Sequence, residues 1–93
     1  MRIIGFIWLE EIVDKLAVKH RVASDEVEQV FEARPSIKRV NKGLFRGEDV
    51  YRALGQSAGG RYLVVFFIYK QTGEALILSA RDMDRKERKS YAR

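Results

Sequence analysis

The amino-acid sequence predicts a single α+β domain of residues 1–93, in which one strand and two helices precede an antiparallel meander and a short closing helix. Apolar residues recur at helical spacing in the first third of the chain. After Pro35, apolar runs of strand length alternate with glycine-containing turns. A chain of 93 residues is also too short to build two independent cores.

The N-terminal residues 2 to about 8 are β-branched and aromatic, which predicts a buried strand. This run lacks a small-residue cleavage site and leads directly into Glu10 and Glu11, unlike a signal peptide. No stretch reaches the roughly 20 apolar residues that a membrane span needs. The chain also has no cysteine, which fits a reducing compartment. We therefore expect a cytoplasmic protein without a membrane partner.

Two amphipathic helices are predicted next. The first has an apolar stripe formed by Leu9, Ile12, Val13, Leu16 and Ala17. Ser24 is the expected N-cap of the second helix, and Asp25 and Glu26 suit the positive end of its dipole. The second helix should end before Pro35, because the residue that precedes a proline avoids the helical region.

The pattern of residues 35–81 predicts an antiparallel meander. We predict an edge strand at 35–40, a turn-rich loop at 41–49 ("NKGLFRGED"), a strand at 50–57 and a tight connection at 58–60. The run "RYLVVFFIY" (61–69) is apolar on both faces, as in a central strand that is covered on both sides. "KQTGE" (70–74) predicts a hairpin turn, and "ALILSAR" (75–81) its partner strand.

A short closing helix is expected at about 85–92. Asp84 and Glu87 have the spacing of a capping box, in which each side chain bonds the backbone of the other residue. Met83 and Tyr91 are expected to dock this helix on the sheet.

The charges are distributed unevenly. The net charge is +5 and the pI about 9.7. Acidic residues are concentrated in the first third, whereas the chain from Arg34 onward is strongly basic. This asymmetry predicts one basic face that attracts phosphates.

Several short stretches, in order, resemble the BrnT family of bacterial toxins. They are "FIW" (6–8), "KH" (19–20), "VF" (30–31), "GEDVYRALGQS" (47–57), "GRYLVVFF" (60–67), "LSAR" (78–81) and "KERKSY" (86–91). The chain departs from the family at Leu9, Leu16 and Arg21, where members usually carry aspartate, asparagine and glycine.

The resemblance implies a fold similar to that of the RelE and ParE toxins. It also implies an endoribonuclease that inhibits translation, on free RNA or at the ribosome. The implied partner is a ribbon-helix-helix antitoxin encoded beside the toxin, in a complex that represses its own promoter and that we expect to be a heterotetramer.

RNA cleavage without a metal needs a base for the 2′-hydroxyl, a clamp for the phosphorane charge and an acid for the leaving oxygen. No metal-ligand spacing is present, so neither a metal nor another cofactor is expected. Arg81 is the strongest candidate, because a guanidinium at the end of a core strand is held firmly and its planar fork matches a phosphate. Strand alternation predicts that it shares a face with Ile77 and Ser79. The alternative is an ion pair with Asp82, Asp84 or Glu48.

Three further residues complete the predicted catalytic set. His20 is the only side chain that ordinarily titrates near neutral pH, although a half-buried histidine that closes its helix is an equal alternative. Glu48 is a candidate base at the start of a strand, or a solvated turn acid. Arg61 flanks the turn that leads into the central strand. The predicted RNA-binding residues are Lys19, Arg52, Tyr69, Arg85, Lys86, Arg88 and Lys89.

Two other functions also fit the sequence. One is a noncatalytic nucleic-acid-binding module with the same basic face. The other is a ParE-like toxin that acts on a protein target, or an inert scaffold retained for its partner.

Overall fold

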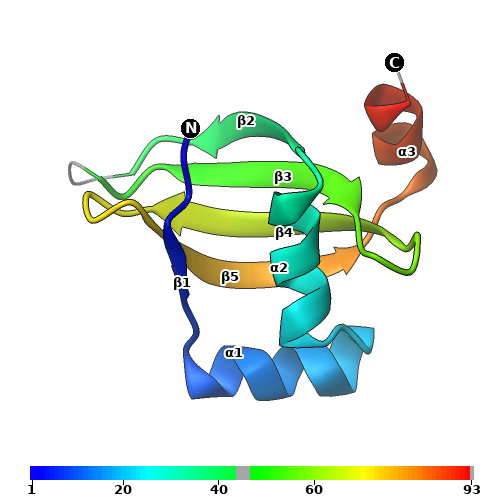
Figure 1. Cartoon of the computed structure of the whole chain (residues 1–93), viewed down its shortest axis with the longest axis horizontal. Helices are drawn as coiled ribbons and strands as arrows, with labels where there is room; N and C mark the ends of the chain where they lie inside the picture. Colours follow the sequence, from blue (N-terminus) through cyan, green and yellow to red (C-terminus); the bar gives the residue numbers. More distant parts are fainter. Residues whose placement is uncertain (44–46, 93) are drawn as a thin grey trace.

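The computed structural model describes residues 1–43 and 47–92. Within these residues the elements follow the predicted order (Figure 1): β1 (Gly5–Ile7), α1 (Glu10–Lys15), η1 (Leu16–His20), α2 (Ser24–Glu32), β2 (Ser36–Asn41), β3 (Val50–Gln56), β4 (Tyr62–Tyr69), β5 (Glu74–Asp82) and α3 (Arg85–Tyr91). The predicted α+β class is therefore confirmed. The predicted loop at 41–49 lies partly outside the described residues, because it includes 44–46.

One mixed sheet organises the described residues, with the strand order β1-β5-β4-β3-β2. The strands β2 to β5 form the predicted antiparallel meander, and β1 adds to the outer side of β5 in parallel. The edge position of β2 and the central position of β4 are confirmed.

Different helices pack on the two faces of the sheet. The helices α1, η1 and α2 lie on one face, which we call the helix face (Figure 1). The main core is there, and its buried residues from the sheet include Leu63, Val65 and Phe67 of β4. The alternate residues of β4 point to the opposite face, which we call the open face. A smaller cluster forms there around Leu54 and Val64, with Met83 and Tyr91 packed against it. The docking of α3 by these last two side chains is confirmed.

A β-bulge changes the predicted alternation of β5. Phe66 pairs with Ser79, but the next residue, Phe67, pairs with Ile77, so Leu78 has no partner in the ladder. The extra residue reverses the alternation between Ile77 and Ser79. Ile77 therefore lies in the main core, whereas Ser79 and Arg81 point to the open face. The prediction that Ile77 shares a face with Arg81 was wrong for this reason.

The first helix is less regular than predicted. After Lys15 it widens into the π-helical turn η1, and Arg21 ends it in the left-handed conformation with its N–H bonded to the carbonyl of Leu16. The wider turn shifts the phase of the residues that follow. Leu16 is buried as predicted, but Ala17 is exposed, so its predicted place on the apolar stripe was wrong. Leu9 is also exposed at the N-cap.

The second helix begins one residue earlier than predicted, at Ser24. Its N-cap is Ala23, whose N–H donates to the carboxylate of Glu26 at 3.0 Å. Ser24 is already the first helical residue, so the predicted cap was wrong. The helix ends at Glu32, and Arg34 turns the chain with a φ of 53° before Pro35.

Candidate functional site

Arg81 holds a carboxylate on the open face of the sheet. Its Nη1 and Nη2 donate to the two oxygens of Glu87 at 2.8 and 2.9 Å, and Nη1 also donates to the backbone carbonyl of Asp82 at 3.1 Å. The side chain of Arg81 is 37% exposed and that of Glu87 is 12% exposed. Arg81 thus does form an ion pair, but with none of the three carboxylates that the sequence suggested.

The start of α3 places Glu87 in this position. The predicted capping box is confirmed: Asp84 accepts from the Glu87 N–H at 2.8 Å, and Glu87 accepts from the Asp84 N–H at 2.9 Å. The side chain of Glu87 therefore bends back toward the end of β5, where Arg81 lies. Tyr91 holds the other end of the helix by an edge-on contact with Tyr62.

The charges of the pair reinforce each other. Hydrogen bonds from Arg81 lower the pKa of the Glu87 carboxyl, and burial opposes this effect. The N–H of Asp84 and the charge of Arg52 lower this pKa further. Glu87 also raises the pKa of Arg81. The carboxylate is therefore ionised at neutral pH.

Arg52 is a second guanidinium at the same place. It lies on β3 opposite Phe66, so its side chain points to the open face as Arg81 does. Its Nε is buried and has no hydrogen-bond partner among the described residues. A buried donor without a partner is unusual in a folded protein, and a bound water or ion is one way in which it can be satisfied. We call Arg52, Arg81 and Glu87 the open-face cluster.

A hollow of about 320 Å³ opens beside the open-face cluster. It is lined by Arg52, Asp84, Lys86, Glu87 and Ser90. Sites that hold a carboxylate with an arginine fork also fit a phosphate, because the two anions present similarly spaced oxygens. The hollow thus combines two cationic side chains, Arg52 and Lys86, with two acidic ones, Asp84 and Glu87.

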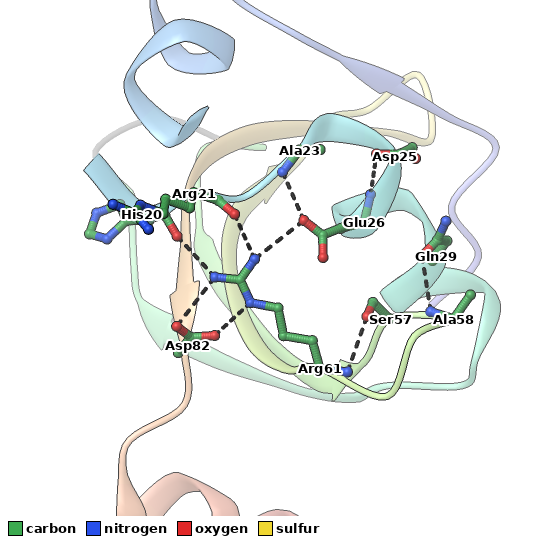
Figure 2. A network of polar contacts seen from close by, with 10 residues as sticks. All are labelled: His20, Arg21, Ala23, Asp25, Glu26, Gln29, Ser57, Ala58, Arg61 and Asp82. Carbon is green, nitrogen blue, oxygen red and sulfur yellow. Dashed lines mark hydrogen bonds and ion pairs between the residues drawn. The ribbon is translucent and has the colours of Figure 1, made fainter. Parts of the chain in front are cut away.

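Arg61 belongs to a different network, near the ends of η1 and β5 (Figure 2). Its guanidinium donates to both oxygens of Asp82, to Glu26, and to the backbone carbonyls of His20 and Arg21. These bonds engage all five of its N–H donors. Asp82 raises the pKa of Arg61, and Arg61 in turn lowers the pKa of Asp82. In this structure Arg61 connects elements, and its donors have no capacity left for a phosphate.

His20 lies beside this network rather than inside it. Its carbonyl accepts from Arg61 at 2.9 Å, while its imidazole ring points away from the guanidinium (Figure 2). The residue is half-buried at the end of η1. This position matches the alternative in which His20 closes its helix.

Glu48 and Tyr69 lie at the opposite end of the strands from Arg81. Glu48 pairs with Lys70 at 3.0 Å, and the Tyr69 hydroxyl donates to the carbonyl of Arg2 at 2.7 Å. The strand register separates them from the open-face cluster, since Arg81 is level with Leu54, near the last residue of β3. The structure therefore does not bring the four predicted catalytic residues together.

The predicted RNA-binding cations gather only in part. Four of them are exposed on α3, namely Arg85, Lys86, Arg88 and Lys89, and of these Lys86 lines the hollow. The guanidinium of Arg88 lies over the ring of Tyr62, 4.1 Å from its centre. Lys19 is exposed on η1, on the helix face.

Glu87 is the functional candidate that sequence reasoning missed. The capping-box spacing was recognised, but it was used only to predict the helix. A capping-box carboxylate folds back over the start of its helix, and this helix starts just after the strand that carries Arg81. Those two facts together would have identified the pair.

The comparisons with known proteins identify one family. A family model described as "Ribonuclease toxin, BrnT, of type II toxin-antitoxin system" matches residues 8–87. No curated protein matches the chain. No helix in the described part of the chain is long and apolar enough to span a membrane.

Proposed function

The chain belongs to the BrnT family of ribonuclease toxins from type II toxin–antitoxin systems, and from this premise we propose that it cleaves RNA at the open-face cluster without a metal ion. The observation that carries the proposal is the convergence of Arg52 and Arg81 on the ionised Glu87, next to a hollow that solvent can enter.

Each guanidinium has a task in the proposed reaction. Arg81 and Arg52 bind the scissile phosphate and stabilise the extra negative charge of the phosphorane. A planar fork held at the end of a strand suits this task, because its donors are oriented before the substrate arrives. The phosphate takes over part of the fork that Glu87 occupies in the free protein.

Glu87 is the proposed base. Its carboxylate takes the proton of the ribose 2′-hydroxyl as the 2′-oxygen attacks the neighbouring phosphorus. The bond to the 5′-oxygen then breaks, and this oxygen takes a proton from the ammonium group of Lys86, which lines the same hollow. The products are a 2′,3′-cyclic phosphate and a 5′-hydroxyl end.

The proposal changes the roles of the other predicted residues. Arg85, Arg88 and Lys89 attract the RNA backbone from the exposed surface of α3. His20, Glu48 and Arg61 are given no role in the reaction. Arg61 is bound within its own network, the His20 ring points away from that network, and Glu48 pairs with Lys70. Lys19 and Tyr69 are not among the residues that line the hollow and are given no role in the reaction.

The finer family properties form part of the same proposal. We infer a RelE/ParE-like fold, cleavage of translated RNA in the cytoplasm and consequent inhibition of translation. The antitoxin is proposed to be a ribbon-helix-helix protein that forms a heterotetramer with the toxin. These inferences are supported by the family match and by the resemblance of the motifs.

Incubation of the purified chain with RNA in a chelating buffer tests the proposal. We expect cleavage with 2′,3′-cyclic phosphate ends, lost in Arg81→Ala and retained in Lys15→Ala, an exposed cation at the end of α1. Circular dichroism checks that both variants fold.

Two results would replace the proposal. RNA that is bound but stays intact, with and without ribosomes, would indicate a noncatalytic module. Growth arrest of expressing cells with intact transcripts would indicate a protein target of the ParE kind.

A further inference from the structure

The edge strand β2 is open to another chain. It bonds only to β3 on one side, and among the described residues no other backbone–backbone hydrogen bond involves Ser36–Asn41. Its residues are exposed except Ile37, which is half-buried. An edge strand of this kind presents a row of free N–H and C=O groups with which an extended segment can pair.

An apolar groove borders this edge on the helix face. Its volume is about 680 Å³, and its apolar lining includes Ile3, Phe6, Phe31, Ile37 and Tyr51. Phe6 and Phe31 meet edge-on at 5.3 Å between ring centres, so this part of the lining is firmly packed. Ile37 connects the groove to the free edge, because it belongs to both.

The open face of the same edge is cationic. Lys38 is exposed and pairs in register with Arg52 of the open-face cluster. Side chains of an added strand alternate between the two faces of the sheet. Those next to Ile37 would therefore enter the groove, and those next to Lys38 would meet positive charge.

We propose that an extended segment of the antitoxin, with alternating apolar and acidic residues, binds as an additional strand along β2. This inference rests on the proposed function in that it takes the antitoxin as the partner. The apolar residues fill the groove, and the acidic residues pair with Lys38 and lie beside Arg52. The bound segment blocks RNA, since it occupies the border of the open-face cluster.

Hydrogen exchange of the chain, alone and in complex with the antitoxin encoded beside its gene, tests the proposal. We expect the amides of residues 36–41 to exchange at least about tenfold more slowly in the complex, because new strand pairing protects them. Binding without protection of these residues would overturn the inference and leave the ribonuclease proposal intact.

Charge reversal supplies an independent test in the folded chain. Lys38→Glu should weaken antitoxin binding by about tenfold or more, while the matched variant Lys15→Glu, on an exposed cation of α1, should not. Equal affinities of both variants for the antitoxin would contradict the pairing of its acidic residues with Lys38.

Two controls separate this inference from its rivals. Protection of residues 36–41 by concentration-dependent dimerisation of the chain alone, or by RNA alone, would assign the edge to another occupant and overturn the inference. Protection by the antitoxin in a chain that fails to cleave RNA would support the inference and reject the ribonuclease proposal.

Discussion

Arg61 and Arg81 have the same side chain, but their N–H groups make different numbers of hydrogen bonds. Arg61 uses five N–H groups on neighbouring elements, whereas Arg81 uses three, on Glu87 and the Asp82 carbonyl. The partner of Arg81 is moreover a single side chain on a seven-residue helix. A phosphate can compete for such a fork far more easily than for one that holds a helix end in place.

The Arg81–Glu87 pair makes stability depend on pH. The pKa of Glu87 is lowered in the folded state, chiefly by hydrogen bonds from Arg81. The stabilisation is therefore fully present above the ordinary glutamate value of about 4.3 and is lost as the pH falls through the lower folded value. We expect urea unfolding at about pH 6 to show a stability advantage of the wild type over Glu87→Gln, and this advantage to shrink toward about pH 2. An advantage that is constant with pH would contradict this coupling.

At the scale of elements, the close contact between α2 and β3 helps to fix the position of the strands. Gly55 of β3 lies under α2, and a Cβ atom there would come within 2.9 Å of Val30 Cγ1 and 3.4 Å of Pro35 Cβ. Val30 is completely buried and has little room to move. Only glycine therefore lets α2 approach the sheet this closely.

Gly55→Ala should destabilise the fold by about 1–3 kcal/mol through overpacking. Gly59→Ala is the matched control, because its Cβ would meet only Ser57 Oγ, at 4.0 Å, and its backbone is not in the left-handed region. Thermal unfolding of the two variants measures the difference. Similar midpoints would contradict the packing argument.

Sequence periodicity was sufficient to predict the order and type of the elements, because apolar alternation and turn residues are local signals. Periodicity did not predict the facing of side chains correctly where one extra residue shifted the pattern. The bulge at Leu78 and the π-helical turn after Lys15 depend on tertiary packing, so Ile77 and Ala17 were placed on the wrong faces. The candidate site shows the same division: the sequence predicts Arg81 as a cation held at the end of a core strand, but its pairing with Glu87 depends on where α3 folds back.

For the molecule as a whole, the sheet separates the main core from the proposed site. The helix face holds the main core and the Arg61 network, whereas the open face carries the open-face cluster and the cations of α3. Part of the basic half of the sequence, namely Arg52, Arg81 and the cations of α3, thus lies on the open face. RNA should approach from that side.

RNA binding should weaken steeply with salt. Each phosphate contact of single-stranded nucleic acid contributes about 0.7 to the slope of log affinity against log salt concentration. Replacing the exposed Arg85 and Lys89 with glutamine should therefore reduce this slope by about 1.4. The matched double variant Lys15→Gln and Lys19→Gln removes two exposed cations from the helix face. An equal reduction in both would show that net charge, rather than the open face, governs binding.

Single-turnover cleavage and RNA affinity of Glu87→Gln test the open-face cluster most directly. Glutamine keeps the size of the side chain and an oxygen that can accept the Asp84 N–H, but it removes the base and releases part of the Arg81 fork. We expect tighter RNA binding together with cleavage that is slower by about 100-fold or more. Cleavage at the wild-type rate would contradict the proposed site.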